Sequence, residues 1–220
     1  NDQIQQTRSM GADLPAQDDF IFWSHPSGHG DETVTRVVNG REFLVPRTGF
    51  FQANLYLTDR MVDEVARLMN EKTRGTVIDA CCGSGLFSIL LAPLAGRMIG
   101  VEINEKSVNH ARLNAEKNNV GNVDFICGDV ESVLKQLDYK KESVDLVILD
   151  PPRTGLSPET LAAICSMELQ DIIYISCNPA TQARDIKFLS GKGYRLLSLQ
   201  PLDMFAQTEH IETIGLLRRE

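Results

Sequence analysis

The chain has 220 residues, of which 42% are hydrophobic and 24% are charged, and its formal net charge is −8 at pH 7. This length and composition predict one α/β domain with a full core plus a small appendage, and they exclude a disordered chain. No apolar run approaches the roughly 18 residues of a transmembrane helix, and no segment has the pattern of a secretory signal. The acidic balance argues against a sequence-independent grip on a phosphate backbone, which needs a basic face.

The five cysteines do not have the spacing of a disulfide framework, and no C-x-x-C pair occurs. We therefore expect reduced thiols, a cytoplasmic location and no metal site. His25 and His29 are four residues apart, but the proline and glycines around them disfavour the helix that would bring both side chains to one metal ion. The chain does not begin with Met, and we expect it to be a segment of a longer protein.

The first part of the chain predicts a small β structure. Residues 1–19 are polar, residues 20–23 and 33–46 read as strands, and Asn39-Gly40 is a typical two-residue hairpin turn. We expect a β appendage over residues 1–46, a remnant of a central domain, followed by a catalytic domain over residues 47–220. Residues 58–72 have apolar side chains at helical spacing, with Thr58 or Asp59 as the expected N-cap.

From Thr76 onward, strands alternate with helices. This order predicts an α/β fold with a Rossmann-like, mostly parallel sheet of seven strands, covered on both faces by helices. The expected strands are 76–80, 97–103, 123–129, 144–150 and 171–177, with helices at 86–95 and 104–119 and a closing hairpin from 194–203 and 210–217.

Residues at strand ends carry the most functional information, because ligands of open α/β sheets bind outside the carboxyl ends of the strands. The first strand ends in DACCGSG, where Gly83 and Gly85 let the backbone turn tightly and approach a ligand. A dinucleotide fingerprint would place a third glycine where Ser88 stands. The next strand ends at Glu102, which is well placed to accept hydrogen bonds from ribose hydroxyls.

A D-x-x-x-G-x-G turn starting at Asp79 and followed by an acidic strand end resembles the S-adenosylmethionine site of Rossmann-like class I methyltransferases. The same resemblance implies that Asp129, at the end of the third strand, lies near the adenine. The alternative is a glycine turn that only serves the fold. The G-S-G pattern alone is weak, and acidic residues at the two following strand ends strengthen it.

The fourth strand leads into Asp150-Pro151-Pro152. In methyltransferase-like sheets, many nucleobase-modifying enzymes hold their target base at this point. The prolines would stiffen the loop, and the carboxylate could bind a base edge. The alternative is that two prolines simply end a strand.

The fifth strand leads into Cys177, followed by Asn178 as an expected N-cap and Pro179 in the first helical turn. The positive end of the helix dipole, with Arg184 as an added positive charge, would favour a reactive thiolate. A buried core cysteine is the alternative, although a structural cysteine would more naturally lie within the apolar run before it.

A cysteine nucleophile is useful to a methyltransferase when its target carbon is not already nucleophilic, as at C5 of a pyrimidine. Thiolate attack at C6 pushes electron density onto C5, which then accepts the methyl group, and a base must remove the C5 proton. Glu209, His210 and Glu212 cluster before the last strand as candidate bases.

The motifs FFQAN, DACCGSG, ILDPPRTGL, SCNPATQARD and MFAQTEHIE together resemble the RNA uracil-C5 methyltransferases. That family makes 5-methyluridine in the tRNA T-loop and in bacterial 23S ribosomal RNA, and the resemblance covers about residues 46–220. It implies that Cys177 is the nucleophile, that Glu212 is the base, and that Asp150 serves both the cofactor and the uracil. It also implies that Phe50 or Phe51 stacks on the flipped uracil and that Arg153 contacts the substrate. The implied S-adenosylmethionine pocket comprises Gln52, Asp79, Cys81, Gly83, Gly85, Leu86, Glu102, Asp129 and Asp150.

Two positions depart from the family pattern: Cys81 stands where an aromatic residue is usual, and Leu86 where Asn is frequent. Both would line the cofactor pocket. Family members also carry an N-terminal β-barrel that binds RNA, and many ribosomal RNA enzymes hold an iron–sulfur cluster. We expect any such elements upstream of this segment, which would also explain its acidic charge.

The residues leave two alternatives open. One is a methyltransferase for another nucleobase, and another is a non-catalytic RNA-binding module that keeps the fold. Arg153 stands where Tyr or Phe would follow D-P-P in an adenine amino-group enzyme, and a cytosine-C5 enzyme would place its cysteine in or near that loop. We expect an RNA partner, either tRNA or ribosomal RNA, and a monomeric enzyme.

Overall fold

The computed structural model describes residues 33–47, 49–69, 74–140 and 143–220. These residues all belong to one compact unit, residues 31–220. The strand predicted at residues 20–23 and the pair His25 and His29 lie outside the described residues.

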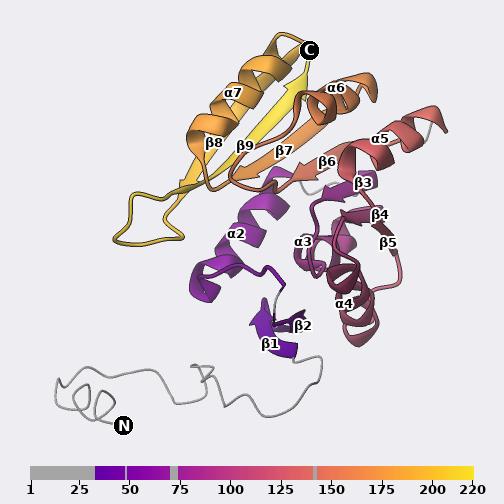
Figure 1. The fold of residues 1–220 in the computed structure, drawn as a ribbon, viewed down its shortest axis with the longest axis vertical. Coiled ribbons are helices and arrows are strands. Elements are labelled where there is room, and N and C mark those ends of the chain that lie inside the picture. Colours follow the sequence, from indigo (N-terminus) through magenta and orange to yellow (C-terminus); the bar gives the residue numbers. More distant parts are fainter. Residues whose placement is uncertain (1–32, 48, 70–73, 141–142) are drawn as a thin grey trace. The chain divides into compact units, whose positions relative to one another are not determined.

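A seven-stranded sheet forms the centre of this unit, and its strands follow the order β5-β4-β3-β6-β7-β9-β8 (Figure 1). β3 to β7 pair in parallel, whereas β9 runs antiparallel to both β7 and β8. The predicted mostly parallel sheet and its closing hairpin are confirmed. The strands are β3 (Arg74–Ala80), β4 (Ala95–Glu102), β5 (Val123–Cys127), β6 (Leu146–Leu149), β7 (Asp171–Ser176), β8 (Tyr194–Leu202) and β9 (Glu212–Arg219).

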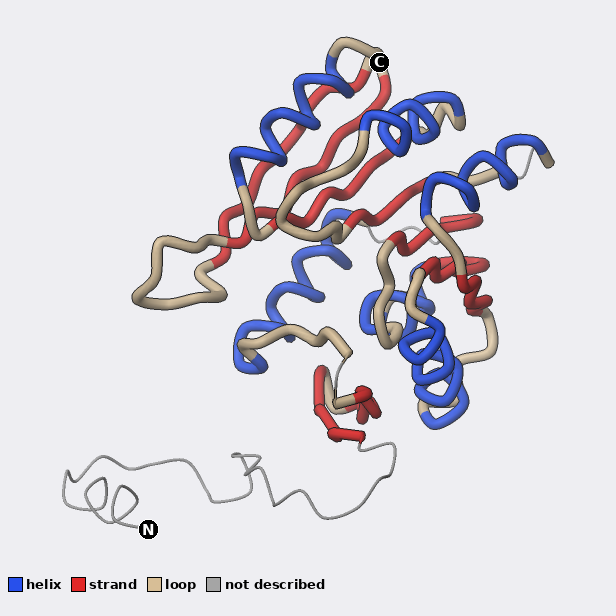
Figure 2. Tube along the Cα trace, viewed as in Figure 1, coloured by secondary structure: helices blue, strands red, loops and turns tan. Residues whose placement is uncertain are grey.

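Helices cover both faces of the sheet (Figure 2). Side chains alternate along each strand, so that Val77 and Ile173 pack into one apolar core while Ile78 and Ile172 pack into the other. The first core includes residues of α2 (Leu55–Leu68), α3 (Leu86–Leu90) and α4 (Glu105–Lys117). The second includes residues of α5 (Val130–Tyr139), α6 (Pro158–Ser166) and α7 (Pro179–Ser190).

Two helix predictions need correction. The helix predicted at residues 86–95 ends at Leu90 and continues as the 3-10 turn η2 (Ala92–Leu94), because Pro93 lacks the N–H that an α-helix requires. The helix predicted from residue 58 begins at Leu55 with Asn54 as its N-cap. Thr58 lies inside that helix, where its hydroxyl donates to the Asn54 carbonyl at 2.8 Å.

The predicted hairpin is present as β1 (Thr33–Val38) and β2 (Arg41–Pro46), which pair antiparallel across Asn39-Gly40. Both turn residues have positive φ angles, 47° and 71°, as a type I′ turn requires. The Asn114 side chain in α4 bonds both backbone groups of Leu44 in β2, at 2.7 and 2.9 Å. The hairpin is therefore bound to the helical layer of the larger fold.

The sheet order reverses between β3 and β6, since the chain leaves β3 toward β4 on one side and later returns to pair β6 on the other. Such a reversal opens a crevice at the carboxyl ends of the strands, where ligands of doubly wound folds bind. Within the described ranges, no helix combines the length and apolar character needed to cross a bilayer.

Candidate active site

A cavity of about 610 Å³ lies at the carboxyl ends of the parallel strands, within the size range of small-molecule sites. Its walls come from the loops after β3, β4, β6 and β7, from the segment before α2, and from the segment leading into β9. The lining residues are Gly49, Phe50, Gln52, Cys81, Gly83, Glu102, Asn104, Ser107, Asp150, Pro151, Pro152, Arg153, Cys177, Phe205, His210 and Glu212.

Glu102 organises one end of this cavity. One of its carboxylate oxygens accepts from the Gly83 N–H at 3.1 Å, and the other accepts from the Asn104 N–H at 2.8 Å. The carboxylate thus ties the glycine turn after β3 to the start of α4. The predicted pairing of a glycine turn with an acidic strand end is present in one wall.

Asp79 lies behind that wall and does not line the cavity. Its side chain is fully buried, and one oxygen accepts from the Ser88 N–H at 2.8 Å and the Ser88 hydroxyl at 2.5 Å. The other oxygen has no protein partner, and burial raises the pKa of this carboxyl to about 6. Ser88, where a dinucleotide fold would have its third glycine, therefore anchors α3 to the end of β3.

Three further residues that were predicted to bind the cofactor, Gly85, Leu86 and Asp129, do not line this cavity. Leu86 lines a smaller neighbouring cavity together with Phe51. Gly85 lines neither cavity, and a Cβ there would meet Ala111 and Phe125 at 3.2 Å, so helix and strand packing explains the glycine. Asp129 is exposed and caps α5 by accepting from the Ser132 N–H at 3.0 Å.

Asp150 follows β6, which lies between β3 and β7 in the sheet, so it stands between the glycine turn and Cys177 in the cavity wall. Its carboxylate accepts a hydrogen bond of 3.2 Å from the Gln52 side chain. Burial, reinforced by the nearby carboxyls of Glu212 and Asp79, raises the pKa of Asp150 well above its usual range. Because Glu212 lines the same cavity, it is costly for Asp150 and Glu212 to be ionised at the same time.

Cys177 and Glu212 line the same cavity because of the strand register. β7 and β9 pair antiparallel with Ser176 opposite Thr213, so the next position outward on each strand holds Cys177 and Glu212. Cys177 is partly exposed, whereas Glu212 is only 3% exposed. Asn178 caps α7 as predicted, accepting from the Ala180 N–H at 3.1 Å.

The prediction that the thiolate of Cys177 is favoured is wrong for this arrangement. Burial and the Glu212 carboxylate raise the pKa of the Cys177 thiol, with a smaller contribution from Asp150 in the same direction. Arg153 lowers that pKa, but it does not reverse the shift. Arg184, expected to help, instead forms an ion pair of 2.7 Å with Asp185.

Glu212 has properties suited to a proton acceptor. Burial raises the pKa of its carboxyl to about 7. A group that titrates near the working pH can both accept and release a proton, which is the requirement for a general base. Of the other candidate bases, His210 also lines the cavity and lies 3.0 Å from the Arg153 guanidinium, whereas Glu209 is exposed and does not line it.

The two predicted aromatic residues differ in their availability. Phe50 is 70% exposed and lines the larger cavity, whereas Phe51 packs against Phe43 with ring centroids 6.0 Å apart. Phe205 also lines the cavity and packs edge-on against His210, with ring centroids 6.2 Å apart. Phe205 was not predicted individually, because it lies in an irregular loop, although it belongs to the MFAQTEHIE motif. Asn104 and Ser107 also line the cavity and were not predicted, and the one signal for them is their position just after the acidic strand end at Glu102.

Comparison with known proteins identifies relatives across most of the chain. Residues 31–220 match the family described as tRNA (uracil-5-)-methyltransferase. An uncharacterized RNA methyltransferase of Caldanaerobacter subterraneus is 37% identical over 191 residues, covering 87% of this chain and 42% of the relative. An uncharacterized RNA methyltransferase of Gloeobacter violaceus is 40% identical over 190 residues, covering 86% of this chain and 40% of the relative.

A solved structure is also similar. The tRNA (uracil-54, C5)-methyltransferase of Pyrococcus abyssi, in complex with S-adenosyl-L-homocysteine, is 33% identical with a TM-score of 0.71, covering 86% of this chain and 45% of that protein. The chain therefore spans less than half the length of these relatives. Since the family match extends over nearly all of the residues that form the fold and the cavity, this chain belongs to the tRNA (uracil-5-)-methyltransferase family.

Proposed function

We propose that the protein methylates C5 of a uridine in RNA with S-adenosylmethionine, through a covalent bond between Cys177 and C6 of the base. The observation that supports this most is the meeting of Cys177 and Glu212 in a cavity whose other end is a glycine turn tied to Glu102. A non-catalytic RNA-binding protein needs neither a cysteine nor a buried carboxyl at that place.

The cavity fits S-adenosylmethionine at the Glu102 end. Glu102 offers carboxylate oxygens for ribose hydroxyls, and the Pyrococcus abyssi relative holds S-adenosyl-L-homocysteine. Gln52 and Asp150 line the path from this end toward Cys177. When bound, the cofactor supplies an electrophilic methyl group.

We place the target uracil at the other end, beside Cys177. Phe50 offers an exposed ring on which a flipped base can stack, and Arg153 offers donors for its edge or for a phosphate. Deprotonated Cys177 attacks C6 and forms an S–C6 bond, and the electron pair of the C5–C6 double bond moves onto C5. C5 then takes the methyl group of S-adenosylmethionine, whose S–CH3 bond breaks to leave S-adenosyl-L-homocysteine. Glu212 removes the C5 proton, and the C5–C6 double bond re-forms as the S–C6 bond to Cys177 breaks.

Because the pKa of the Cys177 thiol is raised, the reaction must begin with the removal of its proton. The thiol must lose its proton before attack, and this proton must pass on to solvent before the Glu212 carboxylate can accept the one from C5.

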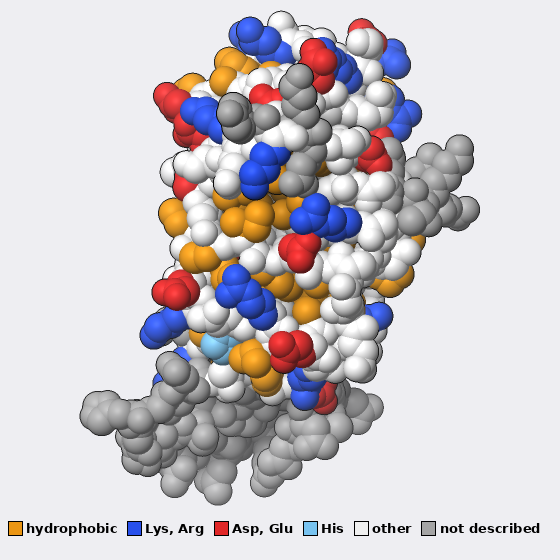
Figure 3. Space-filling view, turned by 90° about the vertical axis from the view of Figure 1, so that its right-hand side faces the viewer, with side chains coloured by type: hydrophobic (Ala, Val, Ile, Leu, Met, Phe, Trp, Pro, Cys, Tyr) orange, Lys and Arg blue, Asp and Glu red, His pale blue; other side chains and the backbone are white. Residues whose placement is uncertain are grey.

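We propose tRNA or 23S ribosomal RNA as the substrate. On the face shown in Figure 3, Lys and Arg side chains alternate with acidic ones and no purely basic patch forms. A further RNA-binding domain would compensate for this, and the longer relatives have room for one. A catalytic domain over residues 47–220, a cytoplasmic location and a monomeric state are parts of the same proposal.

The proposal is tested with tRNA and 23S ribosomal RNA from cells that lack 5-methyluridine. The protein, Cys177→Ala and the control Cys127→Ala are incubated with each RNA and S-adenosylmethionine, and nucleosides are analysed by mass spectrometry. We expect 5-methyluridine in one RNA with the unchanged protein and Cys127→Ala, and none with Cys177→Ala. Methylation at another atom, or an active Cys177→Ala variant, would refute the proposal.

A further inference from the structure

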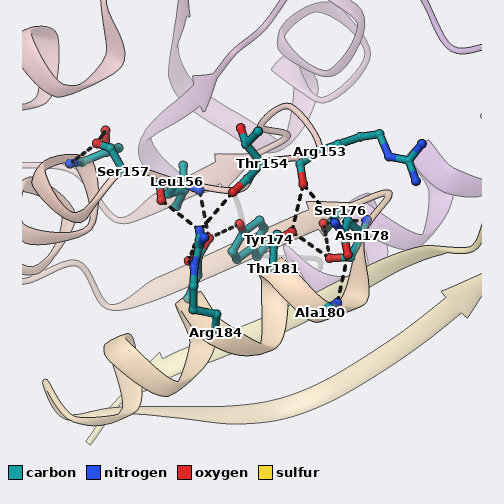
Figure 4. Close-up of polar contacts among 12 residues, drawn as sticks. Arg153, Thr154, Leu156, Ser157, Tyr174, Ser176, Asn178, Ala180, Thr181 and Arg184 are labelled. Carbon is teal, nitrogen blue, oxygen red and sulfur yellow. Dashed lines mark hydrogen bonds and ion pairs between the residues drawn. The ribbon is translucent and has the colours of Figure 1, made fainter.

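The loop between β6 and α6 is bound to α7 through its backbone. Arg153, Thr154 and Leu156 each present a backbone carbonyl or N–H to side chains of that helix (Figure 4). The same loop begins with Asp150 and the two prolines of the cavity wall. The helix begins at Pro179, two residues after Cys177. The two segments that carry the proposed chemistry are therefore joined by one set of contacts.

The first contacts lie beside Cys177. The Asn178 side chain donates to the Arg153 carbonyl at 3.1 Å, and the Thr181 hydroxyl donates to the same oxygen at 3.2 Å. In Figure 4 the Arg153 side chain extends away from these contacts, and its guanidinium lies 3.0 Å from His210. Holding the Arg153 backbone therefore sets the starting point of a side chain that lines the cavity.

Asp185 makes the innermost contacts. It is fully buried, and one of its oxygens accepts from the Leu156 N–H at 2.9 Å and from the Tyr174 hydroxyl at 2.6 Å. Its other oxygen accepts from the Arg184 Nε at 2.8 Å. Arg184 in turn donates to the carbonyls of Thr154 and Leu156, both at 3.1 Å.

Gly155 completes the fit. Its φ of +73° favours glycine, and a Cβ there would lie 2.6 Å from an Asp185 oxygen and 2.7 Å from an Arg184 nitrogen. The loop thus approaches the helix as closely as a backbone without a side chain allows. A buried carboxylate with this many partners is costly to place in a protein unless its geometry is used.

We propose that Asp185, with Tyr174 and Arg184, is a positioning residue that clamps the Arg153–Leu156 loop onto α7 and so fixes Arg153 and Asp150 relative to Cys177. This inference rests on the proposed function and adds residues that touch neither the cofactor nor the uracil. A misplacement of about 1 Å in such a site can cost about a hundredfold in rate, which gives the clamp its importance.

The proposal is tested by comparing Asp185→Ala with Asp185→Asn. The Asn amide oxygen can take the place of the oxygen that serves both Leu156 and Tyr174, so Asn keeps these two hydrogen bonds and loses only the one from Arg184, whereas Ala removes all three. The matched control is Asp171→Ala, since Asp171 is also fully buried and ion-paired at 2.7 Å, with Arg218, but starts β7 at the end away from the cavity. Tyr174→Phe is a milder second test, paired with Tyr194→Phe, which removes a hydroxyl that is buried outside the contacts of the loop.

Two readouts keep the clamp separate from the proposed function. Hydrogen exchange at the Leu156 amide needs no activity, and we expect it to speed about tenfold in Asp185→Ala and much less in Asp185→Asn. With saturating S-adenosylmethionine and RNA, we expect the methylation rate to fall about tenfold or more in Asp185→Ala, with cofactor affinity within about threefold. Tyr174→Phe should shift both rates in the same directions, whereas Asp171→Ala and Tyr194→Phe should leave them within about twofold.

Different results would overturn the clamp and the proposed function. Unchanged exchange at Leu156 in both Asp185→Ala and Tyr174→Phe, or a methylation rate that falls no further than in Asp171→Ala, would overturn the clamp. If the unchanged protein does not methylate RNA, the proposed function fails, and faster exchange in Asp185→Ala still supports the clamp as a structural feature.

Discussion

Replacing Glu212 by Gln should stabilise the protein at alkaline pH. The carboxyl is 3% exposed, and burial raises its pKa from 4.5 to about 7. The folded state therefore holds the proton more tightly than the unfolded chain does. This contribution to stability is fully present below about pH 4.5 and is lost as the pH rises through about 7. Gln keeps the shape of the side chain and has no proton to lose.

The size of the effect follows from the two pKa values. Each pKa unit corresponds to about 1.4 kcal/mol, so ionising Glu212 in the folded protein costs about 3.5 kcal/mol more than in the unfolded chain. Part of this difference is already present at pH 5, and we expect the stability of Glu212→Gln relative to the unchanged protein to grow by roughly 2–3 kcal/mol between pH 5 and pH 8.5. Asp79 has a raised pKa in both proteins and cancels, whereas Asp150 and Cys177 lose the repulsion from the Glu212 carboxylate in the variant, which adds to its gain in stability at alkaline pH.

Urea unfolding at both pH values measures this difference directly. Glu209→Gln is the control, because it removes an exposed carboxylate from the same loop and should leave the pH dependence of stability as it is. A Glu212→Gln variant whose stability relative to the unchanged protein is the same at pH 5 and pH 8.5 would refute the assignment of a buried, proton-holding carboxyl.

Three further outcomes are expected. Cys177→Ala should keep S-adenosylmethionine affinity within a few-fold by calorimetry, and a large loss would place Cys177 in the cofactor site rather than at the uracil. The methylation rate should fall as the pH drops below about 7, because protonated Glu212 cannot accept the C5 proton, and a flat profile between pH 5.5 and 8 would speak against that role. Gly85→Ala should lower stability by about 2 kcal/mol or more in thermal unfolding, since its φ is +88° and its Cβ would crowd Ala111 and Phe125. An unchanged melting temperature would show that the turn can relax.

The sheet could be predicted from the sequence because its signals are local and repeated. Each strand is a short apolar run, and each is followed by a turn or helix start that the residues themselves specify, such as Asn178 before α7. Helix boundaries were less accessible. Asn54 occupies the N-cap position of α2, one turn ahead of the expected start, although its side chain bonds the Met204 carbonyl and does not cap the helix, and Pro93 interrupts an apolar run.

The electrostatics of the site could not be predicted in the same way. A helix N-terminus favours a thiolate, but Glu212 comes from a strand far along the chain and only the β7–β9 register brings it next to Cys177. The contacts of Arg184 could not be predicted for the same reason, since its partner Asp185 and the loop carbonyls that it binds are set by tertiary packing. Local sequence patterns thus predict where the site residues lie in the fold, whereas their protonation and ion pairs depend on contacts between segments far apart in the chain.

Trapping with RNA that contains 5-fluorouridine tests the covalent chemistry most directly. Fluorine at C5 cannot leave as a proton, so an enzyme that attacks C6 and transfers a methyl group stalls with the RNA attached. Peptide mass spectrometry after nuclease digestion should find a methylated fluorouridine on Cys177, absent without S-adenosylmethionine and absent in Cys177→Ala. A protein that methylates ordinary RNA but forms no adduct, or forms it on another cysteine, would contradict the central role of Cys177.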